Sequence, residues 1–236
     1  MLFGKADMRN CSTIMSTLEE FCEIFGLKIN AQKSKVFVSS NIDRRVARDL
    51  SAKCGIPLTF DLGKYLGVPF MHRRVTRGHF NYIIEKMQKN RAGWKTKVLS
   101  IAGRTTLFQA VSSAIPAYTM QTTAIPKNVC DEIDRINRNF LWGDTLERKK
   151  VHLVKWEKVC KSKNAGELGL KKARDQNLAL LAKLGWKLLN KVDSLWCNVL
   201  RNKYLTNTHL YHWPKGKNVS FVWRSILQTD ISLENG

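Results

Sequence analysis

The alternation of apolar and polar positions changes several times along this chain, and each change marks a predicted element. Between Met8 and Phe25, apolar side chains recur at steps of three and four residues, which is the spacing of one helix face. Gly26 follows and is suited to end this helix in a left-handed conformation. The apolar positions of the predicted helix are Ile14, Leu18, Phe21, Cys22 and Phe25.

Residues 27 to 77 combine short β-prone segments with a second helical pattern. Strands are expected at 27–30 and 36–39, separated by the polar and basic turn AQKSK. A helix is expected at 42–53, because a glycine and a proline follow it closely. The sequence DLGKYLGVPF then predicts a tight pair of strands around its two glycines.

From Gly78 the pattern becomes mainly helical. One amphipathic stretch extends from Tyr82 to Trp94, and a second carries apolar residues at 107, 111 and 115 before Pro116 is expected to close it. A third helix is expected to have Pro126 in its first turn, where a proline is tolerated. Its apolar stripe consists of Val129, Ile133, Ile136 and Phe140.

The last third of the chain begins with a non-helical stretch. KVHLVKW alternates like a strand and NAGELGL has the composition of a loop. Helices are expected at 173–192 and 194–204, and the pattern after Thr206 is weak and rich in turn residues. Taken together, these elements predict an α+β fold in which a mixed first part precedes a helical remainder.

The net charge of the chain predicts a kind of binding partner. Forty Lys and Arg against nineteen Asp and Glu give a net charge of +21, with a sequence pI near 10.0. Like charges at this density oppose compaction unless a polyanion screens them, and phosphate groups release counterions when lysines bind them. We therefore expect an RNA or DNA partner. A ribosomal-type or generally adhesive basic protein is the alternative.

Other chemistries find less support in the sequence. The six cysteines form no pair or Cys/His cluster at zinc spacing, so they are expected to be buried, reduced thiols, with no metal site. No apolar run has the roughly 18 residues of a membrane span, and the N-terminus lacks the order of a secretory signal. An intracellular protein that is not inserted in a membrane is expected, in either the nucleus or the cytoplasm.

Carboxylates cluster tightly only at Asp131, Glu132 and Asp134. Near the start of a helix such residues complement its dipole, so a structural role is the better interpretation. His209 and His212 have no obvious acid or nucleophile partner, and nucleotide-binding and hydrolase motifs are absent from the sequence. The chain therefore shows no self-sufficient active site.

Basic residues are more informative than acidic ones. Residues 147–203 contain fifteen Lys or Arg and five Asp or Glu, a net charge of +10, with dense runs such as KWEKVCKSK and LKKAR. Lys183, Lys187 and Lys191 recur every fourth residue and predict a line of cations along one helix, which suits a phosphate backbone; a solvated helix face is the alternative. Four tryptophans lie among these residues, and each is more typical of a core than of a base-stacking platform. They are Trp142, Trp156, Trp186 and Trp196.

Several long segments carry a resemblance to a known family. GLKINAQKSKVFVS, LGKYLGVPF, the central stretch from LSIAGRTTLFQ to NRNFLWG, and NLALLAKLGWKLL occur in this order. They resemble the reverse transcriptases of plant LINE-type (non-LTR) retrotransposons, which are RNA-directed DNA polymerases. The resemblance implies a truncated palm remnant at 1–77, a helical thumb at 78–146 and a basic connection region at 147–236 that precedes a zinc knuckle and ribonuclease H part.

The resemblance also implies roles for individual residues. Lys33, with Lys35 nearby, matches the D motif beside the incoming nucleotide; otherwise it is a plain turn lysine. Lys64 and Tyr65 match the primer-grip hairpin, whose alternative is an ordinary hairpin with a core tyrosine. Thumb residues expected to contact the primer-template backbone, or else to pack in the thumb core, are Trp94, Lys95, Lys97, Arg104 and Thr105.

Catalysis is not expected of the chain alone. LFGKA at the start resembles the residues that follow the family's metal-binding aspartates, so the ligands for the Mg²⁺ ions of the intact enzyme are expected to be missing. Glu167 also replaces a family glycine. The chain is therefore predicted to bind nucleic acid without extending it. Three alternatives stay open: a polymerase subunit completed by a partner, an independent basic nucleic-acid-binding protein, and a relic without function. The oligomeric state is open too.

Overall fold

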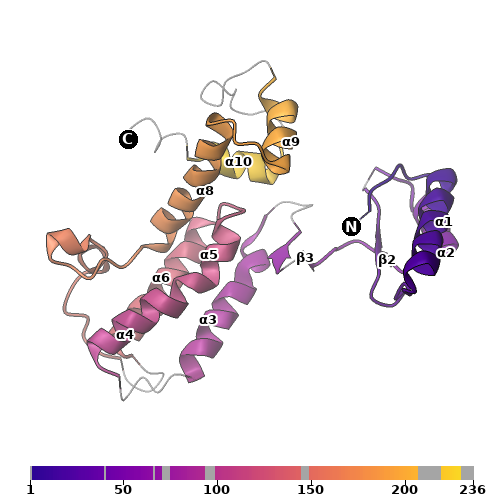
Figure 1. Ribbon diagram of the computed structural model, residues 1–236. Coiled ribbons are helices and arrows are strands. Elements are labelled where there is room, and N and C mark those ends of the chain that lie inside the picture. The colour runs from indigo at the N-terminus through magenta and orange to yellow at the C-terminus, as the bar shows by residue number, and fades with distance from the viewer. Residues whose placement is uncertain are drawn as a thin grey trace. The chain divides into compact units, whose positions relative to one another are not determined.

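The computed structural model describes residues 2–39, 41–65, 67–70, 75–93, 99–144, 149–206 and 219–229. The chain divides into two compact units, Met1–His72 and Arg73–Gly236 (Figure 1). The first unit mixes helices and short strands, and the second is helical in its described residues, so the predicted α+β class is confirmed. The predicted thumb and connection regions both lie within the second unit.

Two helices dominate the first unit, α1 (Met8–Phe25) and α2 (Arg44–Cys54). Asp7 accepts a hydrogen bond from the Asn10 N–H at 2.7 Å and so starts α1, while Gly26 ends it at a φ of 66°. The first predicted helix and its stop are therefore confirmed. The two helices pack together through residues that include Cys11, Ala47 and Leu50, all buried.

The strands of the first unit are short. β1 (Val36–Phe37) pairs in parallel with β2 (Leu58–Thr59), and α2 connects them. β3 (Lys64–Tyr65) and β4 (Val68–Pro69) form an antiparallel pair, which confirms the predicted tight strand pair. The strand predicted at 27–30 is wrong: these residues pair with no described strand, and a turn follows them in which the Asn30 carbonyl accepts the N–H groups of residues 33 and 34.

The second unit consists of helices joined by short connections. Its described elements are η1 (Arg77–Phe80), α3 (Asn81–Gly93), α4 (Ile101–Leu107), the π-helical turn η2 (Phe108–Ser112), α5 (Ala114–Met120), α6 (Lys127–Trp142), α7 (Trp156–Val159), η3 (Lys163–Ala165), α8 (Ala173–Leu189), α9 (Leu195–Tyr204) and α10 (Phe221–Leu227). All four predicted apolar positions of α6 are buried, which confirms its stripe. Pro126 immediately precedes that helix, a position where its missing N–H costs no helical hydrogen bond.

Pro116 does not close a helix as predicted. It lies in the first turn of α5, where an absent N–H costs no hydrogen bond. Its ring would clash with the carbonyl of residue 112 in a regular helix, and the π-helical turn η2 occupies the residues up to that position. Because of this turn, the buried positions are Phe108, Ser112 and Pro116, whereas the predicted 107, 111 and 115 are only half-buried.

Three further expectations in the second unit need correction. KVHLVKW is not a strand, since residues 151–153 pair with no other described strand and α7 begins at Trp156. Helix α8 ends at Leu189, three residues before the predicted end. Helix α10 lies in a segment predicted to be weakly structured, because burial of Trp223 and Ile226 against neighbouring helices stabilises it.

Apolar clusters and a buried asparagine stabilise the second unit within its described residues. One cluster lies around α9 and α10, and the other joins η2, α6 and α7. Asn177 is 3% exposed and fastens α8 to the loop between α5 and α6. Its amide accepts the Ile125 N–H at 2.8 Å and donates to the carbonyls of Met120 and Thr123 at 2.9 Å each.

Candidate nucleic-acid interface

Residues 149–172 form a lysine-rich connection between α6 and α8, which we call the basic strap. It contains eight lysines and two acidic residues, Glu157 and Glu167. Seven of the lysine side chains are exposed and Lys172 is half-buried. The lysines are Lys149, Lys150, Lys155, Lys158, Lys161, Lys163, Lys171 and Lys172.

Apolar side chains anchor the strap to the helical body. Trp156, Val159 and Leu170 are buried, at 5%, 3% and 1% exposed, in a cluster with Phe108 and Leu141. The lysines alternate with these anchors along the chain, so the anchors point inward while the cations reach solvent. Fully burying each anchor is worth roughly 2 kcal/mol, which is enough to hold a segment with little regular structure in place.

Glycines allow the strap to turn. Gly166 and Gly169 have φ values of 78° and 65°, in the left-handed region. The Gly169 N–H donates to the Lys161 carbonyl at 3.0 Å and closes a loop around η3. Glu167 is not among the residues with positive φ, so its replacement of the family glycine does not impose left-handed strain on this backbone.

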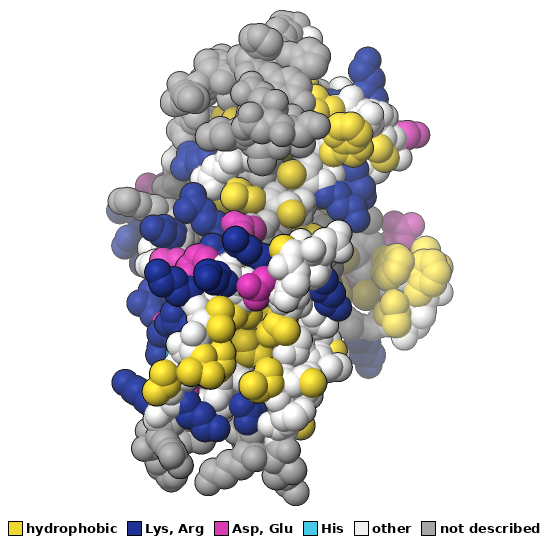
Figure 2. Space-filling view, turned by 90° about the vertical axis from the view of Figure 1, so that its left-hand side faces the viewer, with side chains coloured by type: hydrophobic (Ala, Val, Ile, Leu, Met, Phe, Trp, Pro, Cys, Tyr) yellow, Lys and Arg dark blue, Asp and Glu magenta, His cyan; other side chains and the backbone are white. Residues whose placement is uncertain are grey.

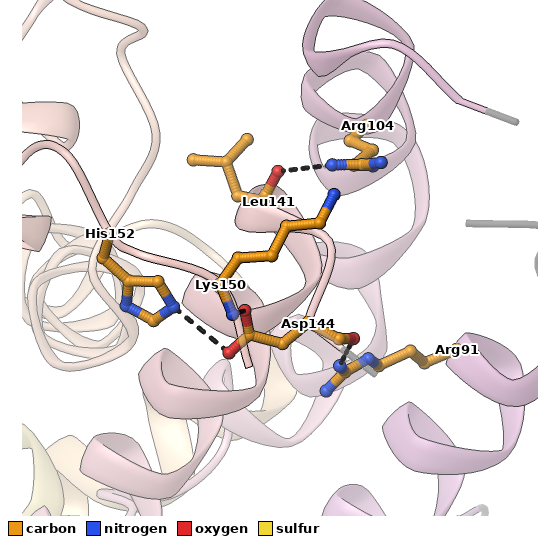
Figure 3. A network of polar contacts seen from close by, with 6 residues as sticks. All are labelled: Arg91, Arg104, Leu141, Asp144, Lys150 and His152. Carbon is orange, nitrogen blue, oxygen red and sulfur yellow. Dashed lines mark hydrogen bonds and ion pairs between the residues drawn. The ribbon is translucent and has the colours of Figure 1, made fainter. Parts of the chain in front are cut away.

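A polar network fixes the beginning of the strap (Figure 3). Asp144 is 8% exposed and follows the left-handed Gly143 that ends α6. Its carboxylate accepts the Lys150 N–H at 3.0 Å and lies 3.1 Å from His152 Nε2. Its backbone carbonyl accepts a hydrogen bond from the Arg91 side chain of α3. Burial lowers the pKa of that arginine below its ordinary value. The network therefore joins α3, α6 and the strap.

Arg104 belongs to this network and not to the surface. Its side chain is 7% exposed, and Nη1 donates to the Leu141 carbonyl at 3.2 Å at the end of α6. A Cβ at Gly143 would meet the Arg104 guanidinium and would also have to adopt a φ of 73°, so another residue there would strain the backbone and displace the arginine. The structure thus gives Arg104 an internal role in place of the predicted backbone contact with nucleic acid.

Among the described residues, no lysine of the strap forms an ion pair with an acidic side chain. Within the part of the chain that the structure describes, the ion pairs are Arg135–Glu132 at 2.6 Å and His152–Asp144 at 3.1 Å. The strap lies at the left of Figure 1, and Figure 2 shows this side with Lys and Arg side chains gathered around a few acidic ones. Uncompensated exposed cations of this kind can bind phosphates without first breaking an internal pair.

The other predicted contact residues are distributed over both units. Lys33 and Lys35 are exposed, and the Lys33 N–H donates to Asn30 Oδ1 at 3.0 Å in a tight turn. Tyr65 is 51% exposed beside Lys64, so the alternative of a core tyrosine is wrong. Lys95 and Lys97, with the neighbouring Trp94, lie outside the described residues.

The predicted line of cations on α8 is only partly present. Lys183 is exposed and Lys187 is half-buried on the helix, but Lys191 lies beyond its end with a φ of 49° and so leaves the row. The sequence pattern identified the basic runs of the strap but did not show that their lysines lie exposed on an anchored segment. Their alternation with Trp156, Val159 and Leu170 is the signal that could have done so.

Asp134 belongs to the acidic cluster and has a structural role. Its Oδ1 accepts the Ala173 N–H at 3.0 Å, where the strap enters α8. Burial raises the pKa of Asp134 from its ordinary 3.8 to about 6, although the hydrogen bond from Ala173 opposes the shift. A raised pKa means that the folded state favours the protonated acid, so stability falls as the pH rises from 3.8 to about 6.

This shift predicts the behaviour of Asp134→Asn. The amide oxygen still accepts the Ala173 N–H but carries no charge, so the variant should gain up to about 3 kcal/mol over the wild type between pH 4 and 7. Urea unfolding at both pH values measures this. Asp131→Asn, at an exposed position of α6, is the control and should show a small difference. A variant that is less stable than wild type at pH 7 would contradict the assignment.

Comparison with known proteins adds two relatives from Arabidopsis thaliana, while no family model matches the chain. The first is the putative ribonuclease H protein At1g65750, 43% identical over 162 residues, which are 67% of this chain and 26% of that protein. The second is the uncharacterized mitochondrial protein AtMg00310, 30% identical over 124 residues, which are 52% of this chain and 80% of that protein. This chain belongs to the same family as AtMg00310.

Membership in the AtMg00310 family does not by itself bring an activity, since that relative is uncharacterized. The chain spans only about a quarter of the ribonuclease H relative. Within the described residues, no group of three His, Cys, Asp or Glu side chains is arranged to hold a metal ion. In that same part of the chain, no helix is both long and apolar enough to cross a membrane.

Proposed function

We propose that this member of the AtMg00310 family is the thumb and connection part of a LINE-type retrotransposon reverse transcriptase and binds the phosphate backbone of a primer-template. The observation that carries the proposal is the basic strap, eight lysines on an anchored segment with no ion-pair partner in the described structure. The 43% identity to a protein named as a ribonuclease H supports an origin in such an element.

The geometry of the strap suits backbone binding better than base readout. Lysine ammonium groups are point charges on flexible stems and contact phosphates without distinguishing bases. The anchors and the Asp144 network reduce the conformational freedom that the strap would otherwise lose on binding. We therefore propose binding with little sequence preference, to an RNA–DNA hybrid or to another polynucleotide of similar charge.

Fluorescence anisotropy of a labelled primer-template hybrid, titrated with protein between 50 and 300 mM salt, tests this function. If eight lysines contact phosphates, the logarithm of the affinity should fall with the logarithm of salt at a slope of roughly −6 to −7, given about −0.7 to −0.9 per contact. A folded sample that binds weakly and without salt dependence would contradict the proposal. Nucleotides and Mg²⁺ added to the complex should produce no primer extension by this chain alone.

A subunit that completes its active site with a partner is distinguished by the same assay. Adding a palm fragment that carries the metal-binding aspartates should restore extension only in that case. Absence of synthesis by a tightly associated pair would reject the subunit hypothesis and leave a nucleic-acid-binding protein.

A further inference from the structure

Trp186 differs from the other tryptophans that the structure describes. It is 61% exposed on α8, whereas Trp156 and Trp223 are 5% and 0% exposed. Trp142 and Trp196 are half-buried. A side chain with such a large apolar surface gains from being covered, so an exposed tryptophan on a folded helix points to a ligand that covers it.

The surroundings of Trp186 leave its ring accessible and add positive charge. On the outward face of α8, the exposed neighbours one and two turns before it are Lys183 and Ala179, and the one a turn later is Asn190. The Asn190 amide donates to the Trp186 carbonyl at 2.9 Å, which turns this side chain back to the helix. Lys187 lies next to Trp186 and is half-buried. The face therefore combines one large aromatic surface with two ammonium groups.

We propose that Trp186 is a stacking site for an unpaired nucleobase, with Lys183 and Lys187 binding the adjoining phosphates. This inference rests on the proposed function and narrows its ligand to nucleic acid that includes a single-stranded portion. Every base has a flat π-face, so stacking on an indole needs no particular sequence. The charge favours a polyanion over a protein partner, because a chain of net charge +21 repels most basic surfaces and the face itself carries two lysines. Bases within a duplex are stacked on one another and are not free to meet the indole.

The decisive experiment compares Trp186→Ala and Trp186→Phe with the wild-type chain. Binding of a labelled 12-nucleotide single strand and of a blunt 12-base-pair duplex is measured at several salt concentrations. We expect Trp186→Ala to weaken single-strand binding about tenfold, while the salt slope and duplex binding stay unchanged. Trp186→Phe retains an aromatic face and should keep most of the affinity. Leu195→Ala, which removes another exposed apolar side chain (83% exposed on α9), is the matched control.

The outcomes separate this inference from the function on which it rests. If the wild-type chain binds neither probe, the proposed function fails and the stacking site with it. If the wild type binds with a steep salt slope but Trp186→Ala binds the single strand equally well, only the stacking site is overturned. Equal losses for single strand and duplex, or for Leu195→Ala, would overturn it as well. A thermal melt confirms that each variant is folded.

Discussion

Replacing Lys155, Lys158, Lys161 and Lys163 of the basic strap by glutamine should weaken binding to a primer-template by more than tenfold at low salt. Each lysine that contacts a phosphate contributes about one unit to the salt slope, so the slope should become shallower by up to about four. The physical reason is that these exposed side chains have no ion-pair partner among the described residues, and their loss removes phosphate contacts without creating internal ones. Anisotropy titrations across salt measure both quantities.

The control for this variant keeps the net charge equal. Glutamine at Lys53, Lys86, Lys89 and Lys127 removes the same charge from exposed positions outside the strap. If the strap is the interface, the control variant should keep most of the affinity and nearly the wild-type slope. Equal losses in both variants would show that binding follows total charge and that the strap has no special place. The anchors of the strap are untouched, so the thermal stability of both variants should match that of the wild type.

Asn177→Leu should produce a large loss of stability in the second unit. The amide is buried and satisfies three backbone groups, the N–H of Ile125 and the carbonyls of Met120 and Thr123. Leucine has a similar volume but no polar atoms, so these groups would be left buried without partners. Because each unsatisfied group costs about 1 to 3 kcal/mol, we expect a loss of at least about 3 kcal/mol in the free energy of unfolding.

Urea unfolding followed by circular dichroism measures the effect of Asn177→Leu. Asn202→Leu, at an exposed position on α9, is the control and should change stability by less than about 0.5 kcal/mol. A loss below about 1 kcal/mol for Asn177→Leu would mean that the loop between α5 and α6 relaxes to satisfy its own backbone groups. In that case Asn177 would not be the residue that fastens α8 to this loop.

The first unit leaves a group of apolar side chains exposed on its helix α1. Several apolar side chains of α1 and the following segment are exposed, with Ile24 at 69% and Phe25 at 62%. Phe21 and Phe25 stack on each other with ring centroids 4.6 Å apart, which covers only part of their surface. The two-residue strands β1 and β2 offer little sheet against which such side chains could be buried.

The sequence by itself determined the local elements with strong periodicity and clear stop signals. Helix α1 has the predicted bounds, because its apolar spacing and the glycine at 26 are local properties. The stripe of α6 and the hairpin of β3 and β4 were predicted for the same reason. The net charge and the basic runs, which need no structure to be counted, predict a polyanion partner, and this stays a prediction.

Tertiary structure alone decided the features that depend on contacts between segments far apart in the sequence. Helix α10 is only seven residues long and has no strong local signal, so packing of Trp223 stabilises it. Arg104 is buried against the end of α6 and Lys163 is exposed on the strap, although both are long cationic side chains. Trp156 is an anchor and Trp186 is a surface residue for the same reason. Identical side chains have the same intrinsic hydrophobicity, and only the partners that the fold brings to each one decide whether it stabilises the core or stays available to a ligand.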